Sequence, residues 1–195
     1  MILETERLVL RPFRESDIDA YADLCADPEV MAFLNAAGSP LSRAEAWRQM
    51  AMYLGHWDLR GFGTWAVAER ATGDFVGRVG LHYPEGWPDR ELGWTIARRF
   101  WGRGYASEAA RAAIAHAFGP LGWDHLVSLI HPNNHRSAAL ARRLGYQAHG
   151  TAEVVGLSLT MYRLNRTPLI AEPPKRAPKT TDTARSSSPA TDQYP

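Results

Sequence analysis

A stretch rich in glycine and arginine, residues 98–108, has the composition of a loop that holds a polyphosphate. Gly102 and Gly104 allow the backbone to turn sharply and to approach a ligand closely. The helix expected after them directs free N–H groups and the positive end of its dipole back at the loop. Three arginines add positive charge: Arg98, Arg99 and Arg103. These features favour a pyrophosphate site, although a tight strand-to-helix turn with solvated arginines has the same composition.

Two common phosphate-binding motifs do not fit this stretch. A P-loop requires Gly-Lys-Ser/Thr, but Gly104 is followed by Tyr105. A dinucleotide fingerprint requires a third glycine or alanine where this chain has Ser107. The pattern that remains is Arg99-x-x-Gly102-x-Gly104.

That pattern resembles the pyrophosphate loop of the GNAT acetyltransferases. Further segments, in the expected order, are similar to the RimJ/RimL-type N-acetyltransferases of that superfamily: Thr5–Pro12, Glu91–Trp94, Asn133–Ser137 and Leu144–Tyr146. Each motif is weak alone, and their joint occurrence over residues 1–165 is specific. The resemblance implies transfer of an acetyl group from acetyl-CoA, by direct attack, to a primary amine of a small molecule or of a protein N-terminus. A non-catalytic module that binds or senses acyl-CoA is the alternative.

The resemblance also implies which residues hold acetyl-CoA. A backbone N–H of the strand 94–97 would polarise the thioester carbonyl. Asn134 would bond the pantetheine arm, and Ser137 would contact the cofactor or cap the next helix. No metal site is expected, because Pro132 breaks the helix that a His131 and His135 pair would need. The cofactor-binding set is Trp94, Thr95, Ile96, Arg99, Gly102, Arg103, Gly104, Tyr105, Ala106, Asn134 and Ser137.

The attacking amine must first lose a proton. An alkyl amine with a pKa of roughly 10 is almost wholly protonated at neutral pH, so a base must accept that proton. Glu91, at the start of the strand before the loop, matches the family's frequent acidic position and is the candidate catalytic residue; an exposed strand-end glutamate is the structural alternative. The family's frequent tyrosine acid, seven residues after the asparagine, is Ala141 here. The proton donor to the leaving thiolate is therefore unassigned.

The acceptor amine must be held by segments outside the cofactor core. Residues 35–40 and 82–90 are the candidates. The second segment contains groups that suit a cationic amine, and Trp87 is expected to line the pocket. These groups are His82, Glu85, Trp87 and Asp89.

Alternating strands and helices must position these residues. Strands are expected at 8–11, 64–68, 75–81, 91–97 and 126–130, with a pair or one long strand over 154–164. Helices are expected after a Ser16–Asp19 capping box, at Asp27-Pro28, after a Ser42–Glu45 capping box, and over 109–118 and 138–144. The helix after Ser42 is expected to bury Trp47, Met50, Leu54 and Trp57, and Cys25 is expected in the core.

The order of these elements predicts a mixed α/β (α+β) sheet, in which 91–130 forms a parallel strand–helix–strand unit. The resemblance implies a single GNAT-like domain with a twisted, mostly antiparallel sheet. Its two central parallel strands would splay apart to admit acetyl-CoA, with helices on the flanks.

Composition limits the remaining possibilities. The chain has 195 residues, a net charge of +1 and one cysteine, which favours one domain at 1–167 and a reducing, cytoplasmic location. Residues 168–195, rich in proline and serine, are expected to be a disordered tail. Residues 1–20 do not have the pattern of a signal peptide. We expect no nucleic-acid or membrane partner, and a monomer or homodimer.

Overall fold

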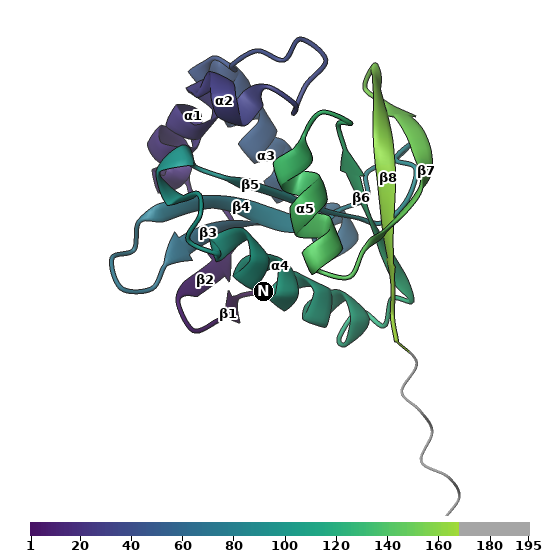
Figure 1. Ribbon diagram of the computed structural model, residues 1–195. Helices are drawn as coiled ribbons and strands as arrows, with labels where there is room; N and C mark the ends of the chain where they lie inside the picture. Colours follow the sequence, from purple (N-terminus) through teal and green to yellow (C-terminus); the bar gives the residue numbers. More distant parts are fainter. Residues whose placement is uncertain (168–195) are drawn as a thin grey trace, which may run out of the picture.

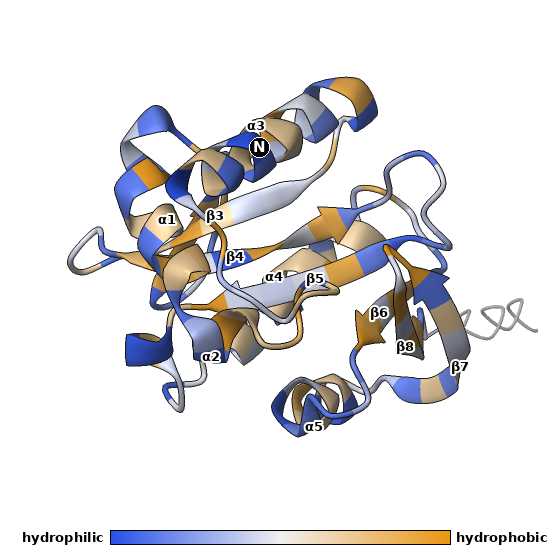
Figure 2. Cartoon of the chain, turned by 90° about the horizontal axis from the view of Figure 1, so that it is seen from above, coloured by the Kyte–Doolittle hydropathy of each residue, from blue (hydrophilic) through white to orange (hydrophobic). Residues whose placement is uncertain are grey.

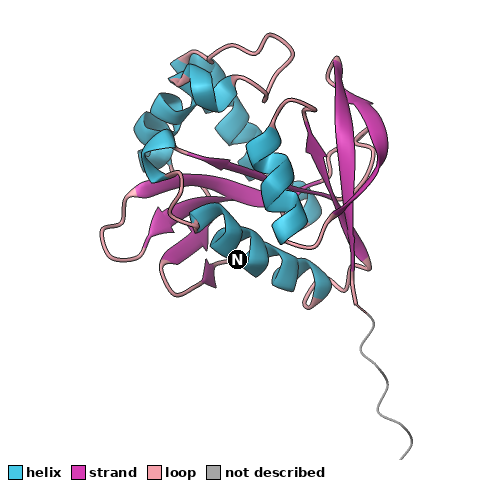
Figure 3. Ribbon diagram, viewed as in Figure 1, coloured by secondary structure: helices cyan, strands magenta, loops and turns pink. Residues whose placement is uncertain are grey.

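The computed structural model describes residues 1–167, and the predicted tail lies outside the described residues. One eight-stranded sheet has the order β1-β2-β3-β4-β5-β6-β8-β7, with helices on both faces (Figures 1 and 3). The strands are β1 (Leu3–Glu4), β2 (Leu8–Arg11), β3 (Thr64–Glu69), β4 (Phe75–His82), β5 (Glu91–Ile96), β6 (His125–Ile130), β7 (Gln147–Val154) and β8 (Leu157–Asn165). The helices are η1 (Glu15–Asp17), α1 (Ile18–Ala26), α2 (Pro28–Met31), α3 (Arg43–Arg60), η2 (Arg98–Phe100), α4 (Tyr105–Phe118) and α5 (His135–Arg143).

Neighbouring strands are antiparallel except for β5 and β6, which are parallel. These two strands pair at a single register position, Glu91 with Val127. The Val127 N–H donates to the carbonyl of Arg90 at 2.9 Å. Beyond that point β5 and β6 no longer pair, so the sheet opens between them. The predicted class, a mostly antiparallel sheet with a splayed parallel pair, is confirmed.

The helices form two layers around the sheet. Helices α1 to α3 lie on one face and α4 lies on the other (Figures 1 and 2). The fully buried Trp65 of β3 packs edge-on against His116 of α4. On the opposite face, Phe75 packs against Tyr21 of α1. Both faces of the central strands are therefore buried, which explains their nearly continuous apolar runs.

The predicted buried face of α3 was wrong in part: Met50 is buried and Trp57 packs against the core, but the other two residues are exposed. Trp47 is 53% exposed and Leu54 is 38% exposed. Both stripes fit the helical spacing and share Met50, so periodicity alone does not separate them. Contacts with other elements decide which stripe is buried, because His56 of α3 stacks on His82 and Tyr53 stacks on Phe13. The stripe that the structure buries is Ala46, Met50, Tyr53 and His56.

The predicted Ser16–Asp19 capping box was also wrong. The Asp17 carboxylate accepts the Arg14 N–H at 2.8 Å and binds the Arg11 guanidinium through two contacts of 2.7 Å. This pairing holds residues 15–17 in a 3-10 turn, so α1 begins at Ile18.

Several other predictions hold. Asp27 caps α2, and Ser42 and Glu45 form the capping box of α3. Cys25 is buried. The C-terminal segment is a strand pair, but its first strand begins at Gln147, earlier than expected.

Substitutions on α3 test which of its faces is buried. Met50→Ala should lower the free energy of unfolding by about 2–5 kcal/mol, because it leaves a cavity in the core. Trp47→Gln should change it by less than about 0.5 kcal/mol, because the indole is mostly in solvent. Urea denaturation of both variants checks this, and a larger cost for Trp47→Gln than for Met50→Ala would contradict the observed burial.

Candidate functional site

A cleft of about 1140 Å³ opens where β5 and β6 diverge. Its walls come from β5, the loop before α4, the first turn of α4, and α5. Helix α2 and the residues after it add a wall that the sequence analysis missed, including Val30 and Phe33. Of the predicted set, the residues that line the cleft are Trp94, Thr95, Ile96, Gly102, Gly104, Tyr105, Ala106, Asn134 and Ser137.

The loop before α4 has the backbone that its glycines predicted. Gly102 has φ of 78° and Gly104 has φ of 80°, a region that favours glycine. Gly104 is the N-cap of α4, and its carbonyl accepts the Glu108 N–H at 3.1 Å. The N–H groups of residues 105–107 precede that first helical bond and have no partner in the helix. They offer an anion three donors and the positive end of the helix dipole.

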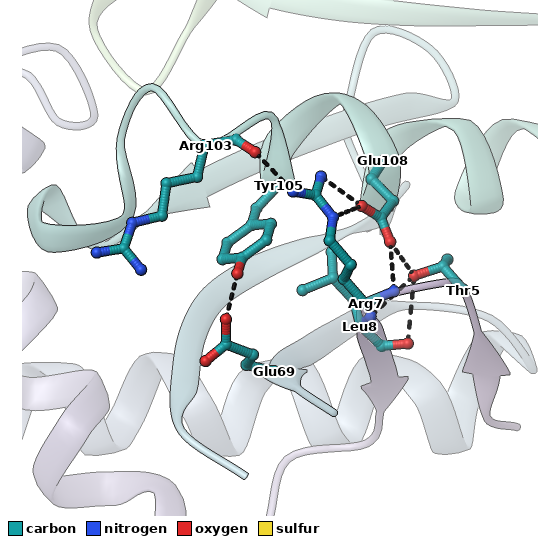
Figure 4. A network of polar contacts seen from close by, with 7 residues as sticks. All are labelled: Thr5, Arg7, Leu8, Glu69, Arg103, Tyr105 and Glu108. Carbon is teal, nitrogen blue, oxygen red and sulfur yellow. Dashed lines mark hydrogen bonds and ion pairs between the residues drawn. The ribbon is translucent and has the colours of Figure 1, made fainter. Parts of the chain in front are cut away.

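A polar network fixes this loop to the N-terminal segment (Figure 4). The Glu108 carboxylate accepts the Thr5 hydroxyl at 2.6 Å and the Arg7 N–H at 2.9 Å. It also accepts the Nε–H of Arg7 at 2.7 Å. The Nη1 group of Arg7 donates to the carbonyl of Arg103 at 3.0 Å. Burial by itself raises the pKa of Glu108, but the hydrogen bonds from Thr5 and Arg7 outweigh it and lower that pKa below its ordinary value. The carboxylate is thus held in the charged form that binds Arg7.

Tyr105 links the same network to the sheet. Its ring lies under the Arg7 guanidinium at 4.7 Å, and its hydroxyl donates to Glu69 of β3 (Figure 4). The first residue of α4 is therefore held from two sides.

The three arginines of the loop bind protein groups. Nη2 of Arg99 donates to the carbonyl of Phe75 at 3.3 Å, and Arg103 lies over the Phe100 ring at 5.3 Å. Arg98 pairs with Asp27 at 2.9 Å and with Glu29 at 2.6 Å. None of the three lines the cleft, and the roles of Arg99 and Arg103 toward a cofactor stay predictions.

Two arginines of α5 line the cleft and were missed by the sequence analysis. They are Arg136, whose guanidinium lies over the Trp101 ring at 4.6 Å, and Arg143. Their spacing of seven residues on a helix next to the predicted asparagine was the available signal.

The helix-capping role that was expected of Ser137 belongs to Asn134. Asn134 is the N-cap of α5, and its side-chain oxygen accepts the Ser137 N–H at 3.1 Å. The predicted cap role of Ser137 was therefore wrong, since α5 begins at His135, three residues earlier than predicted. The Ser137 hydroxyl instead accepts the indole N–H of Trp94 at 3.3 Å, across the cleft from β5.

Glu91 lies at the one register position where β5 pairs with β6, and it is not among the residues that line the cleft. One carboxylate oxygen accepts the indole N–H of Trp87 at 2.8 Å, and the other accepts the Leu129 N–H at 3.3 Å. Burial raises the pKa of Glu91 to about 7, and the bond from Trp87 only partly offsets that effect. A carboxylate with such a pKa exchanges a proton readily near neutral pH.

The main chain of β5 presents an N–H to the gap. Even-numbered residues of β5 direct their main-chain groups away from β4: the carbonyl of Leu92 accepts the Ser128 hydroxyl, and that of Ile96 accepts the Trp101 indole. Trp94 lies between them, so its N–H points into the gap. In the described part of the chain no hydrogen bond is formed to that N–H. It is a donor available to a ligand.

The acidic groups expected to bind the acceptor are engaged elsewhere. Glu85 lies 3.5 Å from Arg60, and Asp89 binds His125 at 2.8 Å. Trp87 does not line the cleft and holds Glu91. Ala141 is fully buried in α5 and offers no proton. Over residues 1–167 no group of three or more metal-ligating side chains is assembled.

Comparison with known proteins identifies the family. The family model described as an acetyltransferase (GNAT) domain matches residues 7–147. The chain belongs to the GNAT acetyltransferases. The matched range includes the open strand pair, the glycine loop and α5, so the family assignment rests on the same elements that build the cleft.

Relatives of this GNAT domain extend over most of its length. It is 31% identical to the uncharacterized protein YkkB of Bacillus subtilis over 150 residues, covering 73% of this chain and 83% of that protein. It is 34% identical to the FsC-acetyl coenzyme A-N(2)-transacetylase of Aspergillus fumigatus, covering 73% of this chain and 63% of that one. A solved acetyltransferase from Agrobacterium tumefaciens superposes with a TM-score of 0.76 at 34% identity, covering 85% and 95% of the two chains. Within residues 1–167 no helix has the length and apolar character needed to cross a bilayer.

Removal of the Glu108 charge tests the network at the loop. Glu108→Gln should lower the free energy of unfolding at pH 7 by about 1–3 kcal/mol, because Thr5 and Arg7 lose a charged acceptor that is itself largely buried. The folded pKa of Glu108 lies below its unfolded value of about 4.3, so its contribution is full above that value and is lost as pH falls through the folded pKa.

Urea unfolding at pH 7 and at pH 3.5 measures this effect. The difference between wild type and Glu108→Gln should shrink at the lower pH, while Glu153→Gln on the exposed edge of β7 should have little effect at either pH. An equal cost at both pH values would show that the charge of Glu108 does not stabilise the fold.

Proposed function

We propose that this GNAT domain transfers an acetyl group from acetyl-CoA to a primary amine by direct attack. The single observation that supports this most strongly is the unpartnered N–H of Trp94, which faces a cleft that begins at an anion-binding helix terminus. The terminus suits the pyrophosphate and the N–H suits the thioester carbonyl. A β-strand rises about 3.4 Å per residue, so the extended pantetheine arm fits along β5 like an added strand.

The proposed reaction conserves atoms and charge. The amine nitrogen attacks the thioester carbon, and the Trp94 N–H stabilises the negative charge that develops on the carbonyl oxygen. The C–S bond then breaks and the C–N bond of the amide remains. The amine proton passes to Glu91, directly or through water, and coenzyme A leaves as a thiolate that takes up a proton.

Ala141 cannot donate a proton to that thiolate, because its side chain has no acidic group. The Ser137 hydroxyl lines the cleft and accepts from the Trp94 indole, which leaves its own hydrogen available to donate. We assign the donor role to Ser137, with water as its source of replacement protons.

The finer assignments rest on the sequence motifs. We place the chain in the RimJ/RimL-type branch, with a small-molecule amine or a protein N-terminus as acceptor and the cytoplasm as its location. A RimL protein solved with coenzyme A has a similar fold, with a TM-score of 0.71 at 19% identity. The alternative is a module that binds acyl-CoA without turnover. One observation supports it, namely that the buried Ala141 stands where the family often has a tyrosine.

Two glycines with matched geometry test the cofactor site. Gly102 and Gly73 both have φ of 78°, and a side chain on either meets no atom within 4 Å. Gly102→Glu should abolish acetyl-CoA binding, because it places a carboxylate at the expected pyrophosphate site. Gly73→Glu introduces the same backbone strain in the β3–β4 turn and should bind normally. Calorimetric titration with acetyl-CoA measures both, and equal affinities would contradict the assigned loop.

The pH profile of acetyl transfer tests Glu91. Because its pKa of about 7 is raised, the carboxylate is the base form only at higher pH. The wild-type kcat should therefore rise through pH 7 and level off above about pH 8. Glu91→Gln should lower kcat by about 10²- to 10⁴-fold at pH 7 and remove that step. Glu91→Gln rates that equal those of the wild type at each pH between 6 and 9, with acetyl-CoA bound normally, would exclude Glu91 as the base.

A further inference from the structure

A second charged group lies on the same face of the sheet as Glu91. In the antiparallel pair of β4 and β5, Arg78 is opposite Thr95 and His82 is opposite Glu91. Residues that alternate along a strand share a face, so Arg78, Thr95 and Glu91 all lie on one side of the sheet. That side is covered by α1 and α3 (Figure 2). By the same alternation, the Trp94 side chain lies on the other side.

Arg78 is a half-buried cation without an anionic partner. Its guanidinium lies over the Tyr53 ring of α3 at 5.2 Å. No ion pair or hydrogen bond to its guanidinium occurs within residues 1–167. Charged side chains that are withdrawn from water are normally paired, because an uncompensated charge costs free energy. An unpaired guanidinium between a sheet and its covering helices is therefore a site for an anion that the protein does not itself supply.

Thr95 provides a second polar group next to this guanidinium. The residue is 6% exposed, and its hydroxyl has no hydrogen-bond partner in the described part of the chain. Buried hydroxyls are nearly always bonded, so an unbonded one indicates a missing partner. Thr95 also lines the main cleft, and Arg78 is its register partner on β4, although Arg78 itself does not line that cleft.

Gly93 leaves room between Thr95 and Glu91. A side chain on Gly93 would approach nothing closer than a Glu91 carboxylate oxygen at 4.0 Å. Its φ lies outside the left-handed region, so no backbone constraint requires glycine there. The space next to Gly93 is therefore open, with an unpaired cation at one end and the proposed base at the other.

We propose that the acceptor is an amine that also carries a carboxylate, with its amino group at Glu91 and its carboxylate at Arg78 and Thr95. This assignment rests on the proposed acetyl transfer and names its substrate class, a free amino acid or a close relative of one. Guanidinium binds carboxylate through two parallel N–H donors, and a hydroxyl completes the set. The Trp87 indole on Glu91 keeps the base at the other end of the site.

The charge balance of this face argues against a polyamine. Of the two carboxylates in the 82–90 segment, Asp89 binds His125 at 2.8 Å, and the Glu85 side chain is fully exposed with Arg60 at 3.5 Å, so neither lies free on this buried face. What remains is one cation, Arg78, and one ionisable acid, Glu91, because burial lowers the pKa of His82 to about 4 and keeps that imidazole neutral at pH 7. That pair complements a zwitterion and repels a second positive charge on the acceptor.

Matched acceptors test the proposal directly. Phenylalanine, phenylalaninamide and phenethylamine share one side chain and differ at the carboxylate; the same triplet is made for leucine and methionine. Release of coenzyme A from acetyl-CoA gives kcat/KM for each acceptor. In the wild type, kcat/KM for the free acid of at least one triplet should exceed kcat/KM for its amide by about 10- to 100-fold. Amides or simple amines that react as well as every acid would overturn the proposal.

Substitution at the proposed site provides the internal control. Arg78→Gln should remove the preference for the acid, and Arg78→Lys should retain part of it because the positive charge stays. Arg48→Gln makes the same change on the exposed side of α3 and should leave the preference intact. A preference for the acid that survives Arg78→Gln would show that its carboxylate binds elsewhere.

A steric variant covers the case in which Arg78→Gln does not fold. Gly93→Val adds a residue that is favourable in strands to the open space, so the fold and acetyl-CoA binding should be retained. Its kcat/KM for the best free acid should fall by at least about 10-fold, mainly through KM. An unchanged kcat/KM would show that the acceptor does not occupy the space over Gly93.

Binding of the reaction product separates this proposal from the acetyl transfer on which it rests. Calorimetry measures N-acetylphenylalanine, N-acetyl-leucine and N-acetylmethionine, each against its amide, on protein saturated with coenzyme A. Tighter binding of an acid, lost in Arg78→Gln, supports the proposal even without turnover. Equal binding of acids and amides, or no binding of either, overturns it. Failure of coenzyme A itself to bind would instead overturn the proposed function.

Discussion

The single register contact between β5 and β6 is the constraint on which the rest of this structure depends. Glu91 and Val127 pair, and the strands then diverge. A sheet that opens in its middle leaves main-chain donors and acceptors without partners, which is costly in a protein interior. Side chains satisfy two of these groups, at Leu92 and Ile96, and leave the N–H of Trp94. The opening therefore creates both a cleft and a donor aimed into it.

The open sheet needs rigid elements on either side. Antiparallel pairing of β2 through β5 holds one arm, and the pairing of β6 with β8 holds the other. The Glu108 network adds a long-range link from the N-terminal segment to the first turn of α4, so the loop that we propose binds the pyrophosphate is fixed before any ligand arrives. Pre-organised donors contribute to catalysis because they need no rearrangement at the moment of reaction.

Features set by local chemistry were predicted well from the sequence. Gly102 and Gly104 have the positive φ values that their positions implied, and Ser42 and Glu45 form the expected capping box. The family, the fold class and part of the cleft lining followed from short motifs that occur in the expected order along the chain. The predicted set includes nine residues that the structure brings to one cleft.

Features set by contacts between distant segments were not predictable in the same way. Trp47 fits a helical stripe as well as Tyr53 does, and only packing against β4 selects the stripe that is buried. The bond from Trp87 to Glu91 depends on the path of a loop, and the unpaired state of Arg78 depends on strand register and on α3 together. Asn134 caps α5 because that helix starts earlier than its apolar pattern indicated.

A crystal structure of the protein with acetyl-CoA tests the central claim most directly, since that claim concerns where the opened sheet directs its donors. We expect the pyrophosphate on the N–H groups of residues 105–107 and the thioester carbonyl within hydrogen-bond distance of the Trp94 N–H, about 2.7–3.2 Å. A pyrophosphate bound away from the start of α4, or a thioester carbonyl that does not reach β5, would contradict the account.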